Sequence, residues 1–344
     1  MSNQIFPYTN HSRFEKPDIY IKGENDCVWT NDGKKYIDCN SGLWNVNFGY
    51  NNPAYKTELD LHFYPTHFWS STVETEDAAS AICKWFGYNK VFFGHSGSDA
   101  IDTAIYISKF TNNKSNILAL KQGFHGTNTQ AHVYEAYTAL IDAVNSDTSA
   151  VLIEPLMITK GVIEFDTGAL KQLFALKEQF NFNIIFDETV TALGRGDYSQ
   201  DWKPDILIAS KGLTNGTYPL SAVLVNKRIS DHIKNTDAIF SHGYTMSGNP
   251  QASVMLMETI KLVNKTNISL IQNKFKELLD TYSLKYTNKG LVFGIHVEDG
   301  IYTRRVLHKK GFLIRQHGNT LLFIPMFTAD VSQYTEFCEI ISTL

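Results

Sequence analysis

Short apolar runs alternate with helical patterns through the middle of the chain. The runs cover residues 91–93, 117–120, 150–153, 183–186, 206–209 and 222–225. Between the third and the fourth run, apolar residues at 170, 173, 174, 176 and 180 recur at helical spacing. Short buried strands separated by helices predict an α/β fold, with a mainly parallel sheet covered by helices. Ligands of such sheets bind at the carboxyl ends of the strands, so the residues after each run are candidates for chemistry.

The two ends of the chain have a different pattern. Residues 18–22 alternate, and the turn Asn31-Asp-Gly33 between 27–30 and 35–38 predicts a hairpin. A helical pattern covers about 252–264, strands are expected at 291–297, 311–314 and 320–324, and a last helix is expected from about 331. No linker or repeat separates these parts. We therefore predict a smaller α+β domain from residues 1–48 and 253–344, and a large α/β domain from 49–252.

Composition narrows the function classes. Hydrophobic residues make up 43% of the 344 positions, which is enough for a large packed core. The net charge of -4, from 31 basic and 35 acidic residues, excludes the broad positive field of a nucleic-acid binder. No apolar run approaches the roughly 20 residues of a membrane span, and the N-terminus lacks the layout of a signal peptide. The four cysteines are scattered, so we expect a cytoplasmic enzyme without structural zinc, disulfides or another metal site.

A phosphate site is predicted after the first apolar run. Residues 94–100 (Gly-His-Ser-Gly-Ser-Asp-Ala) lead into a helical stretch at 101–109. A Gly/Ser-rich turn at a helix start offers free backbone N–H groups and the positive end of the helix dipole. An ordinary turn with Ser98 or Asp99 as the N-cap is the alternative. The motif matches neither a P-loop nor a dinucleotide-binding loop.

Charged residues end two further strands. Asp187 follows the run at 183–186, where a buried carboxylate needs a partner such as a protonated ring nitrogen. A metal ligand or a structural ion pair is the alternative for Asp187. Lys211 follows the run at 206–209, and burial there would lower its pKa and free the amine for covalent catalysis. A lysine that points to the surface is the commoner case.

Two more loops complete the series. Residues 123–126 (Gly-Phe-His-Gly) place an aromatic ring among small residues, where it can stack on a flat cofactor or fill the core. Residues 242–250 (His-Gly-Tyr-Thr-Met-Ser-Gly-Asn-Pro) lead into a helix. In this order, together with Ile153-Glu-Pro155, the motifs resemble those of the class III aminotransferases, which are pyridoxal-phosphate (PLP) enzymes of fold type I. Residues 6–9 and 311–318 are similar to diaminopelargonate synthases, and residues 42–50 and 211–216 to ω-amino-acid and amine:pyruvate aminotransferases.

The resemblance implies a role for each matching residue. Lys211 would form the internal aldimine and shuttle the proton, and Asp187 would keep the pyridinium nitrogen protonated. The residues expected at the cofactor are Gly97, Ser98, Phe124, His125, Asp187, Thr189, Val190, Lys211 and Thr245, the last reaching the phosphate of a neighbouring subunit. Tyr8 and Trp44 would line the substrate pocket, and Arg315 would bind a substrate carboxylate.

The chain also departs from the family pattern. Family members usually carry an aliphatic residue where Thr189 stands, and many carry glutamine where Val190 stands. They carry a small residue where His95 stands. Only 29 residues separate Phe124 from Glu154, fewer than the family normally has, which implies a more open pocket.

Three functions remain open from the sequence. The first is an aminotransferase that moves an amino group from an amine or an ω- or α-amino acid to a keto acid or aldehyde. Such an enzyme works by a ping-pong mechanism and would be a homodimer with its sites at the interface. The second is a PLP-dependent isomerase, either an epimerase or an aminomutase, on the same fold. The third is a non-catalytic binding protein, against which the joint presence of Lys211 and Asp187 argues.

Overall fold

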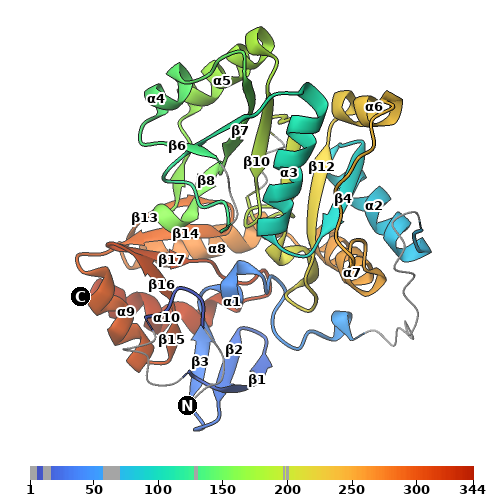
Figure 1. Cartoon of the computed structure of the whole chain (residues 1–344). Coiled ribbons are helices and arrows are strands. Elements are labelled where there is room, and N and C mark those ends of the chain that lie inside the picture. Colours follow the sequence, from blue (N-terminus) through green and yellow to red (C-terminus); the bar gives the residue numbers. More distant parts are fainter. Residues whose placement is uncertain (1–5, 11–16, 57–69, 128–130, 197, 199–200) are drawn as a thin grey trace.

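Strands of the described residues form a central seven-stranded sheet in the order β4-β12-β11-β10-β7-β5-β6. The computed structural model describes residues 6–10, 17–56, 70–127, 131–196, 198 and 201–344 (Figure 1). The strands of this sheet are β4 (Lys90–Gly94), β5 (Asn116–Leu120), β6 (His132–Tyr134), β7 (Thr148–Ile153), β10 (Asn183–Asp187), β11 (Ile206–Ala209) and β12 (Ser221–Val225). All six predicted apolar runs are therefore strands of one sheet.

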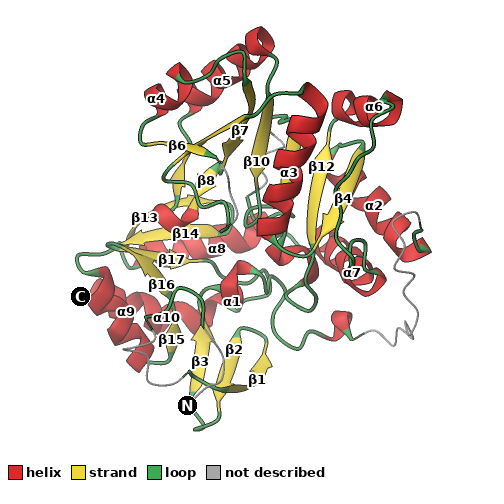
Figure 2. Cartoon of the chain, in the orientation of Figure 1, coloured by secondary structure: helices red, strands yellow, loops and turns green. Residues whose placement is uncertain are grey.

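Helices cover both faces of the central sheet (Figure 2). On one face, α3 (Gly97–Asn112) and α6 (Lys227–Asn235) share a buried cluster with Ile185. On the other face, Ile184 and Phe186 belong to a second cluster, which includes residues of four helices of this middle segment as well as residues of helices near the two chain ends. The four helices are α2 (Val73–Phe86), α4 (Tyr137–Asp142), α5 (Thr167–Phe180) and α7 (Pro250–Lys265). Because successive strand residues alternate between the two clusters, the strands had to be apolar throughout.

One strand of the sheet runs against the others. β12 is antiparallel to both of its neighbours, β11 and β4, whereas β10 is parallel to β7 and β11. A parallel connection needs a crossover of a dozen or more residues. The chain between β11 and β12 holds only residues 210–220, with the 3-10 turn η4 (Lys211–Thr214), so the chain turns back.

Segments from the two chain ends lie together below this sheet in Figure 1. The predicted hairpin is confirmed by β2 (Cys27–Thr30) and β3 (Lys35–Asp38), which pair with β1 (Tyr20–Glu24) and with β15 (Phe312–Leu313). A second sheet joins β13 (Lys285–Lys289), β14 (Val292–His296), β17 (Thr320–Phe323) and β16 (Arg315–His317). The expected strand at 311–314 thus ends early and a new strand begins at Arg315.

Further elements complete this part of the chain. They are α1 (Ser41–Trp44), α8 (Ile268–Thr281), α9 (Gly300–Lys309), η5 (Val331–Tyr334) and α10 (Thr335–Ser342), with η1 (Pro53–Tyr55), η2 (Ile158–Lys160), β8 (Leu156–Met157) and β9 (Ile163–Glu164) elsewhere. The predicted boundary after residue 252 falls inside α7, and the division into two domains stays a prediction. Among the described residues, no helix has the length and apolar character of a membrane span.

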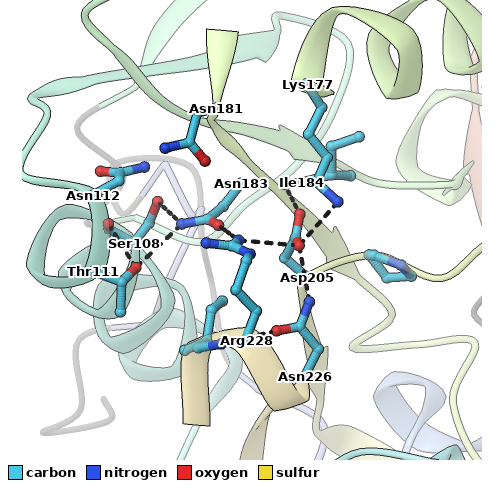
Figure 3. Close-up of polar contacts among 12 residues, drawn as sticks. Ser108, Thr111, Asn112, Lys177, Asn181, Asn183, Ile184, Asp205, Asn226 and Arg228 are labelled. Atoms are coloured by element: carbon cyan, nitrogen blue, oxygen red, sulfur yellow. Dashed lines mark hydrogen bonds and ion pairs between the residues drawn. The ribbon is translucent and has the colours of Figure 1, made fainter. Parts of the chain in front are cut away.

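A buried polar network closes the amino-terminal edge of the sheet (Figure 3). Asp205, just before β11, is fully buried and pairs with Lys177 at 3.0 Å and Arg228 at 3.2 Å. Its carboxylate also accepts hydrogen bonds from the Ile184 N–H and the Asn226 amide, both at 2.9 Å. Two cations and several donors offset the cost of burying one carboxylate. This network is structural and lies at the edge opposite the strand ends where chemistry is expected.

Candidate functional site

A cavity lies at the carboxyl ends of β7, β10 and β11, where the strand rule places a ligand. Eight of the residues predicted from the sequence line it: Trp44, Gly97, Ser98, Phe124, Asp187, Thr189, Val190 and Lys211. Seven further residues line it as well: Ser96, Ile101, Gly126, Glu154, Leu156, Thr159 and Thr191. Segments far apart in the sequence therefore converge on one cavity.

The start of α3 forms an anion cradle in this cavity. Ser96 is the N-cap, and its hydroxyl accepts from the Asp99 N–H while the Asp99 carboxylate accepts from the Ser96 N–H at 2.8 Å. The alternative that Ser98 or Asp99 is the N-cap is wrong, because this capping box places the cap at Ser96, two or three residues earlier. Among the described residues, no acceptor takes the N–H of Gly97 or Ser98. Two free N–H groups at the positive end of a 16-residue helix suit a phosphate.

Close packing around the cradle explains its glycines. A Cβ on Gly126, which has a φ of 73°, would collide with the hydroxyl of Ser98. A Cβ on Gly97 would lie 3.1 Å from the methyl group of Thr189. Any side chain at either position would therefore fill the space that the free N–H groups face.

Asp187 is a buried carboxylate held by hydrogen bonds. It ends β10 and is 6% exposed, and Nδ1 of His125 lies 3.0 Å from its Oδ2. Because an ionised carboxylate can only accept, His125 is the donor, and the Thr189 N–H donates to Oδ1 at 3.1 Å. Burial by itself raises the pKa of Asp187, but the hydrogen bond and charge of His125 outweigh it and lower the pKa. Asp187 is therefore an anion at neutral pH, with room for a further cationic partner.

Lys211 and Glu154 are the other ionisable groups in the cavity. Burial lowers the pKa of the Lys211 amine, although the negative charges of Asp187 and Glu154 oppose this. Burial, and then repulsion by Asp187, raise the pKa of Glu154 to about 7, and its Oε2 accepts from the Phe124 N–H at 3.0 Å. The cavity thus holds an ionised Asp187, a Lys211 amine whose pKa is lowered, and a Glu154 carboxyl group whose pKa is raised to about 7.

The backbone at Lys211 is unusual for a side-chain-bearing residue. Its φ is 41°, in the left-handed region, which costs free energy and persists where surrounding contacts enforce it. Asn215 supplies such contacts, accepting from the Phe48 N–H at 2.7 Å and donating to the Gly49 carbonyl at 3.0 Å. Lys211 then lies with its Nζ 5.6 Å from the centre of the Trp44 ring.

Sequence reasoning missed the residues that hold the Trp44 segment in place. Arg195 is fully buried and donates to Oδ1 of Asn47 at 2.6 Å and to the Pro325 carbonyl at 3.0 Å. A Cβ on Gly212, next to Lys211, would collide with the Asn47 amide. The signal was present in residues 42–50, but partners 148 and 130 positions apart cannot be paired from one sequence.

Four predicted site residues do not line this cavity, and one of them is His125, which donates to the Asp187 carboxylate. Tyr8 is exposed, although its ring packs edge-on against Phe124 with centroids 6.4 Å apart. Thr245 is exposed on the loop before α7, next to Tyr244, whose hydroxyl donates to the Asp99 carbonyl at 3.1 Å. Arg315 lines a different cavity, on the other side of the turn at 41–44. Their roles stay predictions.

The residues present fit a pyridoxal phosphate. The two free N–H groups of α3 match its phosphate, the Asp187 carboxylate its ring nitrogen, and Phe124 and Thr189 supply surfaces on the cavity wall for a flat ring. Val190 contributes no hydrogen bond from its side chain. Among the described residues, no group of three or more His, Cys, Asp or Glu side chains could hold a metal ion.

Comparison with known proteins gives a consistent result. The family model for "Aminotransferase class-III" matches residues 9–133 and 127–344. A chloroplastic gamma aminobutyrate transaminase 3 of Solanum lycopersicum is 26% identical over 97% of this chain and 82% of its own length. Ornithine aminotransferase 2 of Staphylococcus aureus is 28% identical over 94% of each chain. The PMP-bound aminotransferase of Vibrio fluvialis has the same fold, with a TM-score of 0.84, 21% identity and coverage of 99% and 96%.

Proposed function

Because the chain belongs to the class III aminotransferases, PLP-dependent enzymes that transfer amino groups, we propose that the cavity at Lys211 is its active site. One observation carries this proposal. A buried, hydrogen-bonded Asp187, a Lys211 amine of lowered pKa and the free N–H groups of α3 line the same cavity. Each of the three suits a different part of the cofactor, and no fold needs all three for stability.

The proposed division of labour follows from the surroundings of each side chain. When bound, the pyridine ring of the cofactor supplies an electron sink. The free N–H groups of Gly97 and Ser98 hold the phosphate, and Asp187 keeps the ring nitrogen protonated. Lys211 would hold the cofactor through its amine, and this amine would also act as the base that takes the proton from the donor carbon. His125 is a positioning residue, since it acts by orienting and ionising Asp187.

The proposed donor is an ω-amino acid. Two relatives are named for γ-aminobutyrate and ornithine, which carry an amino group distant from a carboxylate. Trp44 and the edge of Tyr8 would face the carbon chain of such a donor, and Arg315 would bind its carboxylate after its side chain swings across the turn at 41–44. A keto acid or an aldehyde then collects the nitrogen in the second half of the ping-pong cycle.

A panel of amino donors tests this function. γ-Aminobutyrate, ornithine, β-alanine and a simple amine are each paired with pyruvate and with 2-oxoglutarate, and the keto and amino products are followed by mass spectrometry. We expect at least one ω-amino acid to give a stoichiometric aldehyde or keto product and a new amino acid. Interconversion of a single amino acid without release of a keto product would contradict amino transfer.

We further propose a cytoplasmic homodimer. Thr245 lies on an exposed loop that also exposes Ile239 and Met246, and it does not line the cavity of its own chain. A second copy would bring Thr245 to the phosphate cradle and cover these apolar side chains, as a two-fold interface requires.

Replacing Thr245 with alanine tests the shared site. We expect PLP affinity to fall by about 1–3 kcal/mol, the cost of leaving a charged acceptor without its donor. Dilution below the dimer dissociation constant should release PLP and activity together, which analytical ultracentrifugation and fluorescence of the released cofactor can follow. Ser241→Ala, an exposed hydroxyl on the same loop, is the matched control and should change neither. A fully active monomer would show that Thr245 has no role across subunits.

A further inference from the structure

A second cavity, of about 740 Å³, lies outside the active site, among the segments from the two chain ends. Its walls come from α9, from β16 and from the first strands, and its charged lining residues are Asp18, Asp38, Arg304, His308 and Arg315. The ring of Tyr20 adds an aromatic surface. A volume in this range is typical of sites for small molecules.

Two arginines of this cavity have no carboxylate partner. Among the described residues, no carboxylate oxygen lies within 4.0 Å of the guanidinium of Arg304 or Arg315, and neither group donates a hydrogen bond. Burial, together with the positive charge of Arg304, lowers the pKa of Arg315, while Asp38 opposes the shift. Both arginines are nevertheless exposed, so water screens their mutual repulsion, but an anion bound between them would contact two positive charges at once.

The two acidic residues of the cavity, Asp38 and Asp18, do not neutralise the arginines. The Asp38 carboxylate already accepts from the Asn40 N–H at 2.9 Å, the Gly42 N–H at 2.5 Å and the Tyr50 hydroxyl at 2.6 Å. Asp18, also among the described residues, forms no ion pair with either arginine. His308 stacks on Tyr36 with ring centroids 5.1 Å apart, which leaves its ring on the cavity wall as a further polar surface.

We propose that this cavity binds a small molecule that carries a phosphate group, with the phosphate between Arg304 and Arg315. The planar fork of each guanidinium matches phosphate oxygens, and two forks match the double charge of a phosphate. The cavity is larger than a bare ion, so the remaining space takes the body of a phosphate ester, against Tyr20 and His308.

Binding at this cavity would regulate the active site through Arg315. The Arg315 N–H donates to Oδ1 of Asn40 at 2.7 Å, which anchors the arginine to the turn at 41–44. Gly42 of this turn lines the second cavity, and Trp44 lines the active site. A phosphate that holds Arg315 in the second cavity would compete with a substrate carboxylate for the same side chain. This consequence, unlike the binding itself, rests on the proposed function.

Titration of the holoenzyme with inorganic phosphate and with glycerol 3-phosphate tests the site. Calorimetry should show saturable binding of one ligand per chain, because PLP already fills the phosphate cradle. Arg304→Gln should weaken this binding by roughly tenfold or more, the loss of one charged hydrogen-bond donor group. Arg305→Gln is the matched control, because Arg305 is exposed on the same helix and does not line the cavity.

The outcomes separate the site from the proposed function. Tighter binding of glycerol 3-phosphate supports a phosphate ester as the ligand, and equal binding supports free phosphate at the same two arginines. Absence of saturable binding, or an equal loss in Arg304→Gln and Arg305→Gln, overturns the site. If binding is present, added phosphate should raise the KM of a carboxylate-bearing donor at constant kcat, and leave the KM of a simple amine unchanged. Binding without this KM effect contradicts only the role of Arg315 at the substrate.

Discussion

Replacing Lys211 with alanine is expected to lower the rate of amino transfer by roughly a thousandfold or more, since the reaction loses its proton carrier. The amine is the group in the cavity whose pKa burial lowers, and its backbone is held at a φ of 41° that an unconstrained lysine avoids. Asp187 does not replace it, because this carboxylate is already hydrogen-bonded to His125. PLP should still bind to Lys211→Ala, through the cradle at α3.

Two measurements check this expectation. Reduction of the holoenzyme with borohydride, followed by peptide mapping, should place the cofactor mass on the peptide that contains Lys211. Lys121→Ala is the matched control, because Lys121 is an exposed lysine at the end of β5 that pairs with Glu135. A Lys211→Ala enzyme that turns over at the wild-type rate, or a cofactor mass on another lysine, would exclude the proposed active site.

The fold could be predicted largely from the sequence, because its information is local. Five of the six apolar runs of the middle segment are buried throughout, and the run at 91–93, in the edge strand β4, is partly buried, so hydrophobicity alone marks the strands. The exception is the direction of β12, which depends on the length of one connection. The N-cap of α3 is Ser96 and not Ser98 or Asp99, two or three residues later, and residue type cannot separate the three because all of them are good N-cap residues. Their hydrogen bonds, not their identities, decide between them.

Cavity residues at strand ends could be predicted from the strand pattern, whereas Trp44 was predicted only from the resemblance of residues 42–50 to known aminotransferases. Asp187 and Lys211 end or follow strands of one sheet, so their meeting follows from topology. The position of Arg315 depends instead on a hydrogen bond to Asn40, which lies 275 positions away in the sequence. It also depends on the segment 41–44, in which three residues have a positive φ. Such contacts are set by tertiary packing, and they place Arg315 in a second cavity that no motif indicates.

One buried aspartate, Asp187, ends β10 and another, Asp205, lies just before β11, and exchanging each for asparagine should have different effects. Asp187→Asn is expected to keep its fold, because an asparagine oxygen can still accept from His125. Its rate of amino transfer should fall by roughly 10²–10³-fold, the usual loss when one preorganised electrostatic partner is removed. An amide cannot hold a ring nitrogen protonated, so the cofactor loses its capacity as an electron sink. Single-turnover rates of the first half-reaction measure this loss directly.

Asp205→Asn is the matched comparison, since Asp205 is just as buried but pairs with Lys177 and Arg228 (Figure 3). Removing this charge leaves two cations without their partner and should cost up to about 3 kcal/mol of unfolding free energy, less than for a fully buried pair because Arg228 is partly in solvent. The folded fraction should retain its activity per molecule, because the network lies at the far edge of the sheet. Denaturant unfolding and single-turnover rates on both variants separate the two roles. Equal losses of activity in the two variants would show that Asp187 serves the fold rather than the cofactor.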